Sequence, residues 1–298
     1  MEIKVSDISG NICAVDSGFL PYRLHGIDFL IIRAAAVNFS YAESKLLSCF
    51  YIPSKVPEPE ILMKLSLDDH ESNIWRSIMR LQKEVSIAIA AAEKFSPSVL
   101  LFDGSIVPLA SDRPEKESSL FSEYAKLIEL YKQLFQLCKD KNIMLAGVIK
   151  DSRGKRFMEL AFGNKQQKMD YENCSDSVFL DYLLKKGERT AVMNYSGPAP
   201  KQPILKDLGE FANNLYVSYL KINSKEQPLR VDFMNFDGDF NKPLSSVYSL
   251  SAIAENYAYP PPLTEVDLCA AVGDVEMEQL KGSLMGFSQL RRNSRPFR

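Results

Sequence analysis

The sequence predicts an α/β protein built on a mixed sheet with helices on its faces. Residues 12–52 hold three strand-like apolar runs joined by short connections, which favour antiparallel neighbours. After residue 69 the apolar period becomes helical, and helical segments then alternate with apolar runs at 99–105 and 143–149. Because such alternation implies parallel crossover units, one sheet should contain both antiparallel and parallel strand pairs.

The first predicted strand, Ile12–Val15, ends at Asp16-Ser17-Gly18, an acid followed by turn residues. Ile27–Val37 and Lys45–Ile52 are the second and third predicted strands. Residues 53–59 carry three prolines and are predicted to form a loop. An acid that ends a core strand lies where the next loop opens, which is where open α/β sheets place their ligands.

Residues 69–95 form a predicted helix that ends at Ser96-Pro97. Its apolar stripe has members at steps of three and four: Ile74, Ile78, Leu81, Val85, Ala88, Ile89 and Ala92. Glu84 lies on the flank of this stripe, whereas Arg76 and Arg80 take the predicted wet face. A carboxylate in this position is either a satisfied surface group or a ligand at the edge of the core, and spacing alone leaves both open.

The apolar run Val99–Phe102 ends at Asp103-Gly104-Ser105. These three residues are either turn chemistry alone or the end of a core strand that carries a functional acid. Residues 118–140 form a second predicted helix, and Ile143–Ile149 forms another buried strand. Lys150 ends that strand, and its ammonium group either reaches a phosphate as a point charge or simply extends into water.

The second half is less regular. Its expected elements are a helix at Ser177–Lys185, a loop at Ser196–Pro203, strands at Tyr216–Ile222 and Leu229–Phe233, and helices at Ser245–Tyr257 and Leu263–Val272. The chain ends in a tail from Gln289 that contains Arg291, Arg292, Arg295 and Arg298. This tail is either a frayed, solvated end or a basic contact surface.

Composition and absent motifs exclude several classes of protein. The 298 residues carry a net charge of -2, so no global field draws the chain to nucleic acid. The two histidines have no partner at helical spacing, which excludes a His-rich zinc site, and no phosphate-binding loop of an ATPase is present. Five cysteines without a C-x-x-C pair, no signal peptide and no apolar run of membrane-spanning length predict a cytoplasmic protein.

The order of the acids matches a ribonuclease H-like nuclease core. In that architecture the first strand, the first helix and a later strand each bring one carboxylate to a common point, here Asp16, Glu84 and Asp103. Clustered carboxylates repel one another unless a cation neutralises them, and oxygen-only ligands suit Mg²⁺ or Mn²⁺. Two such ions can activate water and stabilise the leaving oxygen in phosphodiester cleavage. We therefore predict a ribonuclease H-like mixed sheet core flanked by helices, with additional C-terminal strands and helices.

The sequence resembles the NurA nucleases of archaea and some bacteria. Five stretches carry the resemblance in the family's order: Ala14-Val15-Asp16-Ser17-Gly18 with Ile31-Ile32-Arg33-Ala34, Leu81–Ala90 with Glu84, Leu100–Ser105 with Asp103, Val148–Arg153 with Lys150, and Tyr259-Pro260-Pro261-Pro262-Leu263 through Asp267. No single stretch is very specific, but together they cover nearly the whole chain in one order.

The resemblance implies roles for single residues. Asp16, Glu84 and Asp103 would be the metal-binding acids. The site would hold two metal ions, Mn²⁺ or Mg²⁺. Lys150 and Tyr259 would complete the catalytic set, and Tyr259 falls on a tyrosine linked to activity in the family. Asp267 stands where many members have a histidine; an aspartate also ligates hard divalent ions, so Asp267 is a fourth candidate ligand. The chain reads Asp-Ser-Gly where relatives often read Asp-Gly-Ser.

The resemblance also implies partners and a task. The protein would be a homodimer that acts with HerA, a hexameric ATPase that translocates DNA, in DNA end resection for repair of double-strand breaks by homologous recombination. Its activities would be 5′–3′ exonuclease on DNA ends and endonuclease on single strands. Residues 1–155 would form the core, 156–288 an extension completing the site and the dimer interface, and 289–298 a basic tail. Apolar surface at Tyr216–Ile222 or Tyr248–Tyr257 is the candidate dimer contact.

Two other interpretations stay open at this stage. The chain could be a catalytically silent adaptor of the same fold that loads or gates the ATPase, although the presence of all three acids favours a nuclease. It could also be an unrelated α/β domain whose acids are turn residues, which would require five motifs to align by accident.

Overall fold

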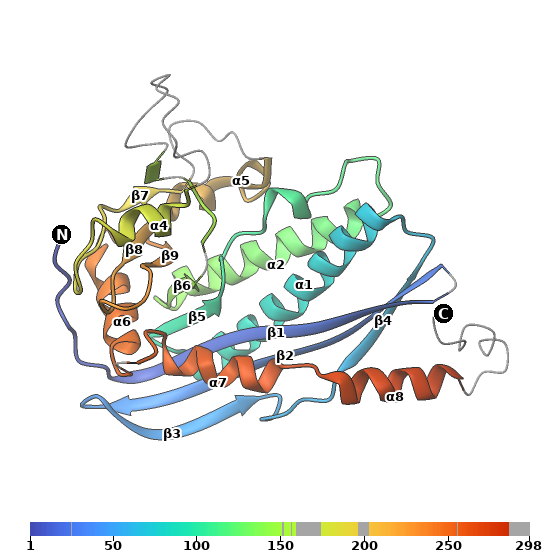
Figure 1. Cartoon of the computed structure of the whole chain (residues 1–298), viewed down its shortest axis with the longest axis horizontal. Coiled ribbons are helices and arrows are strands. Elements are labelled where there is room, and N and C mark those ends of the chain that lie inside the picture. Colours follow the sequence, from blue (N-terminus) through green and yellow to red (C-terminus); the bar gives the residue numbers. More distant parts are fainter. Residues whose placement is uncertain are drawn as a thin grey trace.

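The computed structural model describes residues 1–24, 26–150, 152–155, 157–158, 174–195, 203–254 and 256–285 (Figure 1). Within these residues nine strands form one sheet: β1 (Gly10–Leu24), β2 (Ile27–Ala42), β3 (Lys45–Ile52), β4 (Glu60–Leu65), β5 (Val99–Asp103), β6 (Met144–Ile149), β7 (Met193–Asn194), β8 (Leu215–Leu220) and β9 (Leu229–Met234). The helices are α1 (Asp69–Phe95), α2 (Phe121–Asp140), α4 (Asp176–Asp181), α5 (Pro203–Asp207), α6 (Asn241–Ser251), α7 (Pro261–Ala270) and α8 (Asp274–Met285). The basic tail lies outside the described residues.

The strand order is β3-β2-β1-β5-β6-β9-β8-β7, and the sheet is mixed as predicted. β1, β2 and β3 pair in antiparallel fashion, whereas β1 pairs with β5 and β5 with β6 in parallel. β9 pairs with β6 in antiparallel fashion, so the strands of the second half extend the same sheet. Both the antiparallel start and the parallel crossovers are therefore confirmed.

Several predicted boundaries are wrong. β1 continues beyond Val15 to Leu24 because its pairing with β2 holds through fifteen residue pairs. β4, which follows the proline loop, was not predicted; it pairs with residues 27–32 of β2, where β3 no longer reaches. α6 ends at Ser251, and α8 was not predicted, since only weak apolar periodicity marks it.

The two faces of the sheet bury separate cores. Helices α1 and α2 cover one face, where Val15 and Phe102 are buried, and α6 and α7 cover the other, where Ala14 and Leu101 are buried. In Figure 1, α7 runs along β1 and β2 on the side opposite to α1. Since side chains alternate along a strand, Asp16 and Asp103 have the parity of Ala14 and Leu101 and belong to the α7 face.

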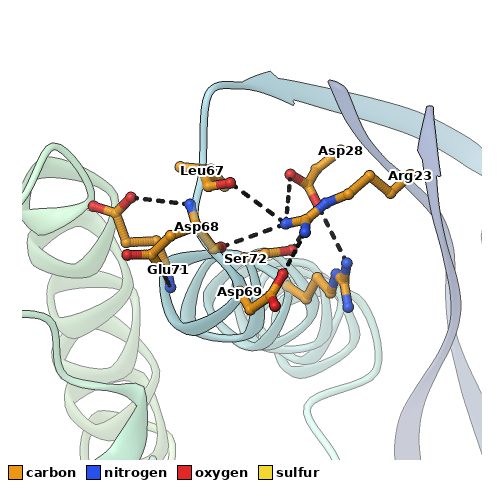
Figure 2. Close-up of polar contacts among 8 residues, drawn as sticks. Arg23, Asp28, Leu67, Asp68, Asp69, Glu71 and Ser72 are labelled. Atoms are coloured by element: carbon orange, nitrogen blue, oxygen red, sulfur yellow. Dashed lines mark hydrogen bonds and ion pairs between the residues drawn. The ribbon is translucent and has the colours of Figure 1, made fainter. Parts of the chain in front are cut away.

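A polar network fixes the start of α1 against the β1–β2 hairpin (Figure 2). Asp68 caps the helix: its Oδ1 accepts from the Glu71 amide at 2.8 Å, and Glu71 completes a capping box. Arg23 of β1 donates to buried Asp28 of β2 at 3.1 and 3.2 Å, and also to Asp69 in the first helical turn. Ser72 donates to Asp28 at 2.6 Å, so strand and helix share one buried carboxylate. This attachment sets the register with which α1 later presents Glu84.

All five cysteines are free. Among the described residues, the helices are all too short or too polar to cross a lipid bilayer.

Candidate metal site

Three carboxylates gather where β1, β5 and α7 meet. Asp16, Asp103 and Asp267 each offer one oxygen, and these atoms all lie within 4.8 Å of one another. Asp16 and Asp103 are half-buried, whereas Asp267 is exposed at the rim. The parallel pairing of β1 with β5 sets Val15 beside Phe102, so the next residues, Asp16 and Asp103, lie side by side. Helix α7 adds the third acid.

Gly18 allows α7 to approach the strand. A Cβ atom at this position would lie 2.3 Å from the carbonyl oxygen of Ala270, so only glycine fits. Arg33 of β2 holds the same end of α7: its guanidinium donates to the Ala271 carbonyl and pairs with Glu276 of α8 at 2.6 Å. These contacts place Asp267, one helical turn before Ala270, beside Asp16.

Gly147 has a matching role next to Asp103. A Cβ atom on Gly147 would lie 2.2 Å from the carbonyl oxygen of Gly104, which itself has a φ of +108°. The loop that leaves Asp103 therefore crosses directly over β6. The Asp-Gly-Ser stretch therefore forms both the end of a core strand and the turn that follows it.

The cluster is electrostatically unfavourable without a counter-charge. Burial and the neighbouring charges of Glu84, Asp103 and Asp267 together raise the pKa of Asp16 to about 7, although the hydrogen bond from the Ser17 amide lowers it. Several half-buried carboxylates in one site repel one another, and a bound cation neutralises this repulsion. All the offered ligand atoms are carboxylate oxygens, a donor set that fits Mg²⁺ or Mn²⁺.

Glu84 reaches the cluster from α1, on the other face of the sheet. It is 2% exposed, and its Oε2 accepts from Ser17 Oγ at 2.5 Å and from Arg80 Nη1 at 2.8 Å. Burial raises the pKa of Glu84, whereas Arg80 and Ser17 lower it. Glu84 lies close enough to raise the pKa of Asp16, but it is not among the three acids whose oxygens meet within 4.8 Å.

Tyr259 and Lys150 both contact Asp103. The Tyr259 hydroxyl donates to Asp103 Oδ1 at 2.8 Å, and burial together with Asp103 raises the tyrosine pKa well above its usual value. Lys150 Nζ lies 3.7 Å from Asp103 Oδ2 and 3.8 Å from the centre of the Tyr259 ring. Burial alone would lower the pKa of Lys150, but Asp103 and its other neighbours raise it, so the lysine stays charged.

Sequence reasoning missed several residues around the site. The helical period assigns Arg80 to the wet face, yet Arg80 is a half-buried partner of Glu84, and Arg76 likewise pairs with buried Asp28. Ser105 donates to Asp232 of β9 at 2.7 Å, and Arg230 pairs with the same carboxylate. An arginine and an aspartate two positions apart in an otherwise apolar strand signal such a buried pair, because they share one face.

Comparisons with known proteins give a family match and similar folds. The family model described as the NurA domain matches residues 10–272. The fold is similar to the crystal structure of the NurA nuclease from Sulfolobus solfataricus, with a TM-score of 0.62 and 16% identity, covering 99% of this chain and 89% of that chain. Comparison with curated proteins gives no significant match.

Two further crystal structures show the same fold. One is NurA bound to dAMP and manganese, with a TM-score of 0.61 and 11% identity over 92% of this chain and 87% of that chain. The other is NurA with manganese, with a TM-score of 0.60 and 10% identity over 96% of this chain and 91% of that chain.

Proposed function

The chain belongs to the NurA family, and on that premise we propose that it is a divalent-metal-dependent deoxyribonuclease. The observation that carries the proposal is the meeting of three carboxylate oxygens within 4.8 Å at one end of a mixed sheet. A structural relative bound to dAMP and manganese supports both the metal and the class of substrate. Bound Mn²⁺ or Mg²⁺ would activate the attacking water and stabilise the leaving oxygen.

The proposed roles follow from the contacts of each residue. Asp16, Asp103 and Asp267 are the proposed first ligands, and Glu84, which Ser17 and Arg80 orient, is the proposed fourth. Tyr259 holds Asp103 in place through its hydroxyl group. The two-metal stoichiometry, 5′–3′ polarity on DNA ends and endonuclease activity on single strands are proposals that rest on the family.

A nuclease assay with the purified protein tests this function directly. We expect single-stranded and end-labelled duplex DNA to be degraded with Mn²⁺ and to stay intact when the metal is chelated. Degradation that continues in excess chelator would contradict the proposed chemistry. A folded protein that binds Mn²⁺ without cleaving any DNA would instead indicate the silent adaptor.

Lys150→Ala should lower turnover by about 10²-fold, because a charged group that stabilises the transferring phosphate contributes on that scale. The Lys150 side chain is 32% exposed, so its removal should leave the melting temperature within about 1 °C. Turnover is measured by steady-state kinetics. The control is Lys126→Ala, a change of an exposed lysine on α2, which should leave turnover unchanged. Unchanged turnover would remove Lys150 from the mechanism.

The proposed homodimer has a second candidate contact surface besides the predicted stretch Tyr248–Tyr257. Tyr216–Ile222 lies mostly buried in β8 and directly after it, whereas the Tyr248–Tyr257 stretch exposes Ile253 by 51% and Tyr257 by 45%. Among the described strands, β3 and β4 pair only with β2, so they are outer strands of the sheet. The side chains exposed on β4 are Ile61 by 51%, Met63 by 71% and Leu65 by 63%. An exposed apolar row on an outer strand favours contact with a second copy of the chain.

Met63→Lys should convert the dimer into a monomer, because a charge in the centre of an apolar interface is costly to desolvate. Light scattering should give about twice 33.6 kDa for the unmodified chain and 33.6 kDa for the variant. Leu183→Lys, a change of another exposed apolar residue outside this row, should leave the dimer intact. A dimeric Met63→Lys protein would place the interface elsewhere.

The proposed partner is a HerA-type hexameric ATPase, and the proposed task is end resection in the cytoplasm. Two features of the sequence support a separate motor: the chain has no nucleotide-binding loop, and its net charge of -2 gives weak capture of DNA. In the assay above, adding the ATPase should accelerate degradation of duplex ends only while ATP is hydrolysed. Equal activity without the ATPase would contradict the proposed partnership but not the proposed metal site.

A further inference from the structure

A cavity of about 510 Å³ lies on the α1 side of the sheet. It lies between α1, the loop that follows β5 and the carboxyl end of β6. Its lining includes Gly104 and Ser105, which directly follow Asp103, and Ile149, which precedes Lys150. Cavities of this size hold small ligands such as a nucleotide, and two of the lining segments connect directly to Asp103 and Lys150.

Three arginines from three separate segments line this cavity. They are Arg80 of α1, Arg153 of the segment after β6, and Arg230 at the start of β9. Arg153 is exposed, and it forms no ion pair with any other residue in the described part of the chain. Arg230 also lies over the ring of Tyr195, with 5.5 Å from its guanidinium carbon to the ring centre.

The acids that pair with Arg80 and Arg230 are less exposed than the arginines themselves. The Arg80 side chain is 28% exposed and its partner Glu84 is 2% exposed, whereas Arg230 is 16% exposed and its partner Asp232 is fully buried. Asp112, the acidic residue in the lining, is buried and accepts from Ser77 Oγ at 2.8 Å and the Leu109 amide at 2.7 Å. The cavity therefore presents three guanidinium groups with five donors each, of which Arg80 gives one and Arg230 gives two to its partner acid.

We propose that this cavity binds a phosphodiester group of the DNA strand adjacent to the scissile one, with Arg80, Arg153 and Arg230 as its donors. Planar guanidinium groups match the oxygens of a phosphate, and their convergence from three segments suits a single anion. The proposal rests on the proposed nuclease function. It assigns the arginines to positioning the strand, while the four proposed ligands hold the metal.

The test measures binding separately from cleavage. Each variant is made in an Asp103→Asn background, and the affinity for a labelled single-stranded oligodeoxynucleotide is measured by anisotropy at several salt concentrations. Arg153→Gln is the first variant, since its exposed side chain does not support the fold. The second is the pair Arg230→Gln with Asp232→Asn, which removes both charges and avoids leaving a buried carboxylate alone.

Each variant should weaken binding by about tenfold and reduce the slope of log affinity against log salt by about 0.7, the value for one lost single-strand phosphate contact. The matched control is Arg113→Gln with Asp207→Asn, an ion pair of the same 2.7 Å length outside this cavity, which should change neither quantity. Unchanged affinity and slope in a folded Arg153→Gln protein would overturn the proposal, even if the paired variant fails to fold. Turnover is measured separately in protein with Asp103 intact. A protein without nuclease activity would show no turnover there, whereas a protein without this subsite would show unchanged oligonucleotide affinity in the Arg153→Gln variant.

Discussion

Asp103→Asn should lower nuclease turnover by about 10²-fold or more without lowering the stability of the metal-free protein. Asp103 lies at the centre of the site, where its oxygen meets those of Asp16 and Asp267 and its other contacts are Tyr259 and Lys150. The asparagine keeps the oxygen that accepts from Tyr259 but removes a negative charge from a repulsive cluster. A residue that only supports the fold would lose stability and activity together.

Thermal unfolding with and without Mn²⁺ checks this result. The unmodified chain should gain melting temperature when Mn²⁺ is added, because a ligand that binds the folded state stabilises it, and Asp103→Asn should lose most of that gain. Asp7→Asn, an exposed acid near the opposite end of β1, should behave like the unmodified protein in both assays. Full turnover or an unchanged Mn²⁺ response in Asp103→Asn would refute the assignment of this acid as a ligand.

Gly18→Ala should damage both stability and activity, although it adds only one methyl group and changes no charge. The new Cβ would stand 2.3 Å from the Ala270 carbonyl oxygen, which belongs to backbone and has no rotamer to change. α7 must therefore move, and overpacking of this kind costs about 1–3 kcal/mol, or a fall of about 2–10 °C in melting temperature for a chain of this size. Because Asp267 lies on α7, the third carboxylate moves away from Asp16 and affinity for Mn²⁺ should fall as well.

Gly282→Ala is the control, since a Cβ at that position of α8 meets no atom within 4 Å. Alanine favours a helix over glycine, so this variant should be neutral or slightly stabilised. Calorimetry and Mn²⁺ titration of the two variants compare the same chemical change in a crowded and an open position. A Gly18→Ala protein with normal stability and normal Mn²⁺ affinity would show that α7 does not depend on this close approach.

The sequence by itself determined the elements of the core and the position of two acids along them. Asp16 and Asp103 were found because each ends a short apolar run, and such a run is a local signal that does not depend on distant residues. The boundaries of α1 agree with the prediction for the same reason, since twenty-seven residues of helical period leave little choice. The antiparallel start followed by parallel crossovers also follows from connection lengths alone.

Tertiary structure decided which groups meet. Asp267 lies beside Asp16, 251 positions away in the chain, because Gly18 allows α7 to approach β1 and Arg33 holds the end of α7. Neither contact produces a periodic pattern in the sequence. The helical stripe placed Glu84 at the edge of the core, but its burial and its pairing with Arg80 depend on how α1 packs on β1. The three arginines of the cavity come from segments up to 150 positions apart. Local periodicity records which face of an element is apolar, whereas the meeting of charged groups depends on backbone approach distances that only the packed chain fixes.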